Sequence, residues 1–276
     1  SPIRLAVREA TGERREFWVP RERPDGELLA FVGLPPQRAT FQAWTLVHDG
    51  MKLGAIRFSP WLPQLVARID SAVDRMRGVD AMIVDLRGNP GGAALMASGV
   101  AGHFTRDTLT LVTMLARGST LRYVANPRRV NPALQRVEPF AGPLVLLVDA
   151  GTASTSEFFA GGLQAAKRAV VVGDTTAGMA LPALTAALPF GDRLMHAIAD
   201  ARLPTGTALD GRGVIPDVVV TIDRRRLAMG QDPEFLVAAI VAASRARMAR
   251  GPAPTAPPAP PTARPVPPAT SRTGPG

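Results

Sequence analysis

The sequence predicts an α/β fold in which a mainly parallel sheet is covered by helices. Two observations carry this prediction. Apolar, strand-like runs alternate with helix-like segments between Met51 and Gly173, and two glycine-containing loops each follow such a run. This alternation is typical of βαβ units, whose ligands bind beyond the carboxyl ends of the strands. Chemistry is therefore expected where the two loops leave their strands.

The first half of this core is expected to contain three strands and two helices. Strands are predicted at residues 51–58, 81–86 and 109–115. A helix is predicted at residues 61–77, because six apolar residues recur on one stripe with a period of 3.6 residues. They are Leu62, Leu65, Val66, Ile69, Val73 and Met76. A second helix is predicted after Gly92.

The second half continues the alternation. Strands are predicted at residues 144–148 and 169–173, and the helix between them is expected to begin after Ser154. Residues 182–188 and 194–201 are joined by the turn sequence PFGD. They are expected to form a hairpin that extends the edge of the sheet.

A long helix and a tail are expected at the end of the sequence. Asp232 followed by Pro233 is the pattern of an N-cap with proline at the first helical position, so a helix is predicted from there to about Arg250. The residues expected to face inwards are Phe235, Leu236, Ala239, Ile240 and Ala243. Residues 251–276 are dominated by Pro, Ala and Thr and are expected to be a disordered tail.

Composition narrows the class of protein. With 276 residues, 46% of them hydrophobic, the chain is long enough for a large α/β core. The net charge of +9 could indicate an anionic partner, but the arginines are scattered and aromatic residues make up only 5%. Few side chains could therefore stack on bases, and nucleic acid is not expected as a partner. No run reaches the roughly 18 apolar residues of a membrane span, and the absence of cysteine excludes disulfides and thiolate metal sites.

The loop GTASTSE, residues 151–157, carries a candidate nucleophile. It places Ser154 at or near the start of the predicted helix, where unpaired backbone N–H groups favour developing negative charge. A structural reading is also open. Ser154 and Glu157 fit the S-x-x-E capping box, which stabilises a helix by about 1 kcal/mol.

The loop DLRGNPGG, residues 85–92, is the expected partner of that serine. It follows a buried-strand pattern and ends in a turn. Gly91 and Gly92 have no Cβ atoms, so backbone N–H groups there can approach a ligand closely. Together the two loops look like an oxyanion loop and a nucleophile loop.

Four motifs in this order resemble the C-terminal processing peptidases and their tricorn-core relatives. They are DLRGNPGG, GTASTSE, RAVVVGDTTAG at residues 168–178 and LDGRGVIPDVVV at residues 209–220. The resemblance covers residues 53–220. It implies a Clp protease/crotonase-like core that acts on a peptide or unfolded protein substrate, without a cofactor or a metal ion.

For the active site, the resemblance implies that Ser154 is the nucleophile of a serine endopeptidase. The backbone N–H of Thr155 and that of Gly91 or Gly92 would then form the oxyanion hole.

The general base of such a mechanism is the open point. The processing peptidases use a lysine, supported by a glutamine four residues later, but Met179 and Ala183 occupy these positions here. A serine hydroxyl without a base is a poor nucleophile. Tricorn-like relatives instead use an N-terminal histidine assisted by a carboxylate, whose position is held by Asp210. The dipeptide Asp210-Gly211 is also an ordinary turn sequence.

Each histidine has a structural explanation. His48 precedes a turn, His103 lies near the end of a predicted helix, and His196 lies in a predicted strand. None is singled out as the base by its place in the sequence.

The first 24 residues read as two short strands around a G-E turn and resemble the closing strands of a PDZ domain. They are expected to be a residual PDZ-like segment before a peptidase core at residues 25–250. The first part of such a domain is not among them, so the sequence is expected to be a fragment, with a histidine available upstream. The family resemblance implies an extracytoplasmic location, although residues 1–7 lack the apolar region of a signal peptide.

Three functions remain open. The first is a serine endopeptidase. The second is a pseudoprotease that binds peptides and has lost its chemistry at Met179. The third is a crotonase-like thioester enzyme, since that fold also pairs two loop N–H groups as an oxyanion hole. The sequence does not predict an oligomeric state.

Overall fold

The structure, a computed structural model, describes residues 2–9, 11–22, 24–31, 34–221 and 223–251. Its centre is a seven-stranded sheet in the order β14-β10-β9-β6-β5-β4-β3. Five neighbouring strands are parallel: β5 (Met51–Ser59), β6 (Ala81–Asp85), β9 (Leu144–Val148), β10 (Ala169–Gly173) and β14 (Val218–Val219). Two antiparallel strands, β4 (Leu34–His48) and β3 (Glu27–Phe31), complete one edge. The predicted α/β fold with a mainly parallel sheet is confirmed.

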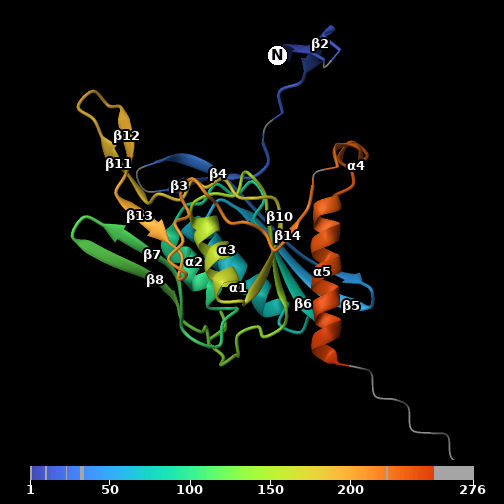
Figure 1. The fold of residues 1–276 in the computed structure, drawn as a ribbon, viewed down its shortest axis with the longest axis vertical. Helices are drawn as coiled ribbons and strands as arrows, with labels where there is room; N and C mark the ends of the chain where they lie inside the picture. Colours follow the sequence, from blue (N-terminus) through green and yellow to red (C-terminus); the bar gives the residue numbers. More distant parts are fainter. Residues whose placement is uncertain (1, 10, 23, 32–33, 222, 252–276) are drawn as a thin grey trace, which may run out of the picture.

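Helices cover both faces of this sheet (Figure 1). On one face lie α1 (Val66–Arg75), α2 (Ala94–Ala101) and α3 (Thr155–Ala165), and on the other lies α5 (Pro233–Arg250). Strand β9 shows why its sequence is apolar throughout. Leu144, Leu146 and Val148 belong to the core beneath α1–α3, whereas Val145 and Leu147 belong to the core beneath α5.

The predicted strand at residues 109–115 forms as β7 (Leu109–Ala116), but it lies outside the parallel sheet. It pairs antiparallel with β8 (Ser119–Ala125) and β13 (Ala199–Arg202). This three-stranded sheet packs against α2 and α3. Apolar periodicity reports which faces of a strand are buried but not which strand it pairs with, so this partner could not be predicted.

The predicted hairpin forms as β11 (Ala183–Ala187) and β12 (Arg193–Ala197), which pair only with each other. Its expected extension of the central sheet is wrong. The edge beside β10 is taken by the short strand β14, and the flanking Asp217 accepts a hydrogen bond from the Val171 amide at 2.8 Å. The hairpin instead projects from the core (Figure 1).

The helix predicted at residues 61–77 is shorter than expected. A 3-10 turn, η1 (Pro63–Leu65), precedes α1, while the apolar stripe is buried as predicted apart from the half-buried Val66. Trp61 stays outside the helix because its amide donates to the carbonyl of Gly91 at 2.9 Å.

Helix α5 begins where predicted, and Asp232 caps it by accepting a hydrogen bond from the Phe235 amide at 2.9 Å. Its expected inner face is wrong in part, since Leu236 and Ile240 are 43% and 47% exposed. The buried side is a row of small residues: Ala238, Ala239, Ala242, Ala243 and Ala246. Apolar residues occur on every side of this helix, so periodicity could not select the face.

The two N-terminal strands form as predicted, as the hairpin β1 (Ile3–Arg8) and β2 (Arg14–Val19), which stands apart from the core (Figure 1). The division at residue 24 and the likeness to a PDZ domain stay predictions. The expected disordered tail lies outside the described residues from 252 onwards. A short helix, α4 (Arg224–Ala228), precedes α5. None of the helices in the described residues is long and apolar enough to cross a membrane.

Candidate active site

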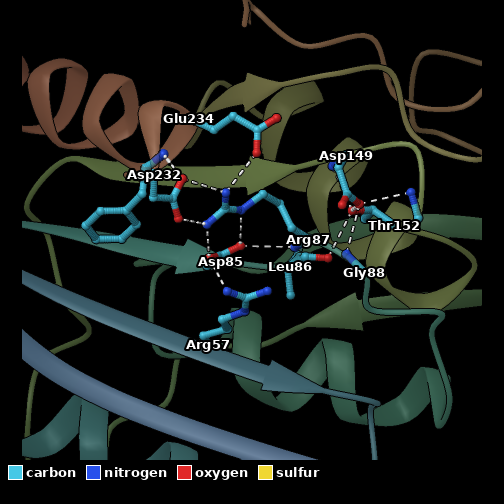
Figure 2. Close-up of polar contacts among 11 residues, drawn as sticks. Arg57, Asp85, Leu86, Arg87, Gly88, Asp149, Thr152, Asp232 and Glu234 are labelled. Atoms are coloured by element: carbon cyan, nitrogen blue, oxygen red, sulfur yellow. Dashed lines mark hydrogen bonds and ion pairs between the residues drawn. The ribbon is translucent and has the colours of Figure 1, made fainter. Parts of the chain in front are cut away.

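The loops after β6 and β9 lie side by side at the carboxyl ends of their strands. The Gly88 amide donates to Asp149 Oδ1 at 2.9 Å, and the Thr152 hydroxyl donates to the carbonyl of Leu86 at 2.9 Å (Figure 2). Further on, the Ala153 amide donates to the carbonyl of Asn89 at 3.0 Å. The structure thus brings together the two loops that the sequence singled out.

Buried polar side chains hold these loops beneath their surface. Asn89 Nδ2 donates to the carbonyl of Phe58 at 2.8 Å, and Ser156 Oγ donates to the carbonyl of Asn89 at 3.1 Å. The indole N–H of Trp61 donates to Ser156 Oγ at 2.8 Å. Asn89, Ser156 and Trp61 are fully buried, so their hydrogen bonds are shielded from water and fix the loop positions.

Ser154 occupies a special place on this frame. It is the only residue from Thr152 to Leu163 that is not buried. Its backbone has φ 54° and ψ −118°, a conformation that costs free energy for a residue with a side chain and is found most often at functional sites. Ser154 and Glu157 are arranged as a capping box, but only the Glu157 half is a hydrogen bond of good geometry: Glu157 Oε2 accepts from the Ser154 amide at 2.8 Å.

Gly91 lies directly against this serine. It has φ +98°, and a Cβ atom added to it would stand 2.6 Å from the Ser154 Cβ. Its amide donates to Asn89 Oδ1 at 3.0 Å and is thereby occupied. The amides of Gly92 and Thr155 make no hydrogen bond with other described residues. Of the two glycines, Gly92 therefore has the unoccupied N–H. The Thr155 hydroxyl donates to the Gly92 carbonyl at 2.8 Å and so ties the glycine loop to the start of α3.

A fully buried carboxylate joins Ser154 to the segment that follows β10. Glu157 Oε2 accepts from the amides of Ser154 and Met179 at 2.8 and 3.1 Å, and Oε1 accepts from the Gly178 amide and the Thr176 hydroxyl at 2.8 and 2.6 Å. Four donors compensate for the loss of water around this charge. Because Ser154 and Met179 donate to the same oxygen, their amide nitrogens can be no farther apart than the sum of the two distances.

Met179 and Asp210 therefore lie near the serine, whereas Ala183 does not share these contacts. Met179 has an exposed side chain, and Asp210 Oδ1 accepts from the neighbouring Ala180 amide at 3.3 Å. The Gly211 amide donates to the carbonyl of Gly178 at 2.8 Å. Ala183 is exposed at the start of β11. The structure thus places the second loop pair, 176–180 and 210–213, beside the nucleophile loop.

The described histidines lie elsewhere. His48 is paired with Met51, the first residue of β5. It therefore lies at the amino ends of the parallel strands, whereas Ser154 lies beyond their carboxyl ends. His103 is fully buried and its Nε2 lies 2.8 Å from Asp70 Oδ1; burial lowers the pKa of this histidine. His196 is exposed on β12. None of the three makes a hydrogen bond with Ser154.

A cluster of charges anchors the first loop to α5 (Figure 2). Arg87 Nε and Nη2 donate to Asp85 at 3.0 and 2.8 Å, Nη1 and Nη2 donate to Asp232 at 2.8 and 2.7 Å, and Nη1 also donates to Glu234 at 2.8 Å. Burial alone would lower the pKa of the Arg87 guanidinium, but the hydrogen bonds to Asp85 and Asp232 outweigh it and raise that pKa. No group of three or more acidic or histidine side chains in the described part of the chain is placed to hold a metal ion.

An apolar hollow of about 350 Å³ lies beside the glycine loop. Residues of η1, α1 and α2 line it, among them Pro63, Val66 and Met96. Ala93, which directly follows Gly92, is also part of its wall. The apolar lining of this hollow suits an apolar side chain of a bound ligand.

Known proteins are similar to this chain in sequence and in fold. The chain is 30% identical over 175 residues to the carboxyl-terminal-processing protease of Synechocystis sp., covering 63% of this chain and 39% of that protein. It is also 30% identical over 193 residues to the chloroplastic C-terminal processing peptidase of Tetradesmus obliquus, covering 69% and 38% of the two. The fold is similar to that of the photosystem II D1 C-terminal processing protease, with a TM-score of 0.56 and 24% identity over 80% of this chain and 55% of that one.

The chain spans about two fifths of the length of these curated relatives. Residues 52–220 include all four motifs and the elements that carry the loops described above. Residues 52–220, more than half of the sequence, match the family described as peptidase family S41, and the chain belongs to this family.

Proposed function

We propose that this protein is a serine endopeptidase with Ser154 as its nucleophile. One observation carries the proposal, namely the environment of Ser154, which alone is accessible in the buried stretch 152–163. Its Cβ lies against Gly91, and the unoccupied amides of Gly92 and Thr155 belong to the two loops that meet there. In peptide hydrolysis, Ser154 Oγ bonds to the carbonyl carbon, and the two amides stabilise the oxyanion. The C–N bond then breaks, the amine leaves with a proton, and water hydrolyses the acyl-enzyme.

The substrate that suits this site is an extended peptide or an unfolded protein. The apolar hollow between η1, α1 and α2 would receive an apolar side chain close to the scissile bond. The names of the relatives, which refer to carboxyl-terminal processing, agree with a peptide substrate. From the resemblance to the C-terminal processing peptidases, we propose that this activity lies outside the cytoplasm, periplasmic or secreted. Cell fractionation tests that location, and recovery in the cytoplasm would contradict it.

A second candidate, a pseudoprotease that binds peptides, is favoured by Met179. The backbone of this residue lies beside Ser154, yet its side chain carries no ionisable group that could accept a proton. Removal of the base from a serine enzyme leaves only the rate supplied by binding and by the oxyanion hole. The peptidase reading therefore requires a base from outside the described contacts.

A fluorophosphonate probe is expected to label the protein at Ser154, because such probes require a reactive serine hydroxyl. Labelling, measured by mass spectrometry of the digested protein, should vanish in Ser154→Ala. It should persist in Ser119→Ala, which removes an exposed serine from β8. Labelling that survives in Ser154→Ala would exclude this serine as the nucleophile. If the wild-type protein stays unlabelled but binds peptides, the pseudoprotease reading holds.

Asp210 is proposed to orient the base. Asp210→Ala is expected to lower peptide turnover or the labelling rate by about tenfold or more. It should leave the melting temperature nearly unchanged, because Asp210 is exposed and, within the described part of the chain, its carboxylate accepts a single long hydrogen bond, from Ala180. Unchanged turnover together with an unchanged melting temperature would remove Asp210 from the mechanism.

A further inference from the structure

A second hollow, of about 300 Å³, lies at the amino ends of the parallel strands, whereas Ser154 lies beyond their carboxyl ends. Its walls are the chain before β9, the turn between α3 and β10, and the last turns of α5. Both β9 and β10 begin here, whereas the catalytic loops follow the carboxyl ends of β6 and β9. The two sites are therefore separated by the full length of the strands.

Three cationic side chains line this hollow: Lys167, Arg168 and Arg245. Among the residues that the structure describes, no acidic one lines it. None of the three forms an ion pair with another residue that the structure describes. Three cationic residues without a described acidic partner thus lie around one hollow.

Arg168 is held in place without a counter-charge. Its Nε donates to the carbonyl of Phe104, and its Nη2 donates to the carbonyls of Phe140 and Gly142 at 2.8 and 2.9 Å. Nη1 makes no hydrogen bond within the described part of the chain and remains available. Burial, with a smaller contribution from the nearby Arg106, lowers the pKa of Arg168 to about 10. A partly buried guanidinium bonded only to neutral carbonyls would be stabilised by an anion.

The neighbouring arginines of α5 show that the lack of partners is local. Arg247 pairs with Asp49 at 3.3 Å, and Arg250 pairs with Asp80. Both lie in the same helix end as Arg245, where the helix dipole favours cations. The dipole can therefore account for positive charge at this end, but it does not explain why Arg245 lacks the acidic partner that Arg247 and Arg250 each have among the described residues.

We propose that this hollow binds a phosphate-bearing ligand, held by Lys167, Arg168 and Arg245. A phosphate group carries up to two negative charges and offers several oxygens, so it can accept from an ammonium and two guanidinium groups at once. The group could belong to inorganic phosphate or to the headgroup of an anionic phospholipid, and the chemistry of recognition is the same. This inference does not depend on Ser154.

Two measurements at low ionic strength test the site on the intact protein. Isothermal titration calorimetry with inorganic phosphate detects the free anion, and sedimentation with phosphatidylglycerol vesicles detects the headgroup, with phosphatidylcholine vesicles as reference. Binding is expected in at least one measurement. Arg245→Gln and Lys167→Gln should each weaken it by about tenfold, because each removes a charge-assisted contact.

Arg247→Gln is the matched control, since it removes the same charge from the same helix end but outside the hollow. It should change the affinity by less than about twofold. Binding of phosphate alone identifies a free phosphate ligand, and binding of vesicles alone identifies a lipid headgroup. Binding in neither measurement would overturn the proposal. So would an equal loss in Arg247→Gln, which would show attraction to net positive charge only.

Discussion

Arg87→Ala is expected to lower the free energy of unfolding by about 3–5 kcal/mol, because it removes the hydrogen-bonded counter-charge of two buried carboxylates. Asp85 is 1% exposed and takes two hydrogen bonds from this guanidinium, while Glu234 is nearly as buried. The same arginine also holds Asp232, the N-cap of α5. Removal of one side chain therefore loosens both the strand end before the glycine loop and the start of a helix that covers the sheet. Urea unfolding followed by circular dichroism measures the change.

Arg57→Ala provides the control. Arg57 also approaches Asp85, but at 3.7 Å and with its side chain 47% exposed. Its loss should cost less than about 1 kcal/mol. Equal destabilisation by the two variants would show that net positive charge near Asp85, and not the buried network of Arg87, supports this region.

The contribution of the cluster should also depend on pH in a defined direction. Burial raises the pKa of Asp232, but the hydrogen bonds from Arg87 and the Phe235 amide, together with the charges of Arg87 and Arg57, outweigh it, and the net pKa lies below the ordinary value of 3.8. A carboxyl group with a lowered folded-state pKa stabilises the protein above its unfolded-state pKa. That stabilisation is lost as the pH falls through the folded-state value. The difference in stability between the wild-type protein and Arg87→Ala should therefore shrink below about pH 4.

The sequence predicted correctly those elements that are determined by residues close together in the chain. The runs LVLLV and AVVVG, each bounded by turn residues, gave β9 and β10 at the observed positions, and Asp232-Pro233 gave the start of α5. The pairing of β7 and the free position of the β11–β12 hairpin depend on which backbone edges remain open after the sheet has formed. No periodicity in either segment carries that information.

The candidate site divides in the same way. Ser154 and the glycine pair were identified from two short loops, GTASTSE and DLRGNPGG, in which the informative residues are neighbours in the sequence. The Arg87 cluster was missed because Asp232 lies 145 residues away in the chain. Glu157 was recognised only as a capping residue, since three of its four donors belong to Thr176, Gly178 and Met179. A glutamate in the first turn of a wholly buried helix was the available signal, because a buried charge requires several donors.

Met179→Lys is expected to raise the rate of fluorophosphonate labelling at Ser154 by about 10²–10⁴-fold, the usual contribution of a positioned general base. Glu157 accepts from the amides of both Ser154 and Met179, so a lysine in place of Met179 would have its backbone beside Ser154. Only the neutral amine accepts a proton, and the Met179 side chain is 69% exposed. The gain should therefore increase from pH 7 towards pH 10, near the ordinary pKa of lysine.

Leu181→Lys is the matched control for this variant, because Leu181 is exposed and lies two residues further along the same segment. It adds the same charge without the backbone contact to Glu157, and it should leave the labelling rate close to that of the wild-type protein. A gain confined to Met179→Lys would mean that the loop amides and Ser154 are already in working geometry and that a base at this position speeds attack by the serine. An equal gain in both variants would reduce the effect to general attraction of the probe. No gain in either would mean that the loops no longer present Ser154 for attack, and the pseudoprotease reading would then account for Met179.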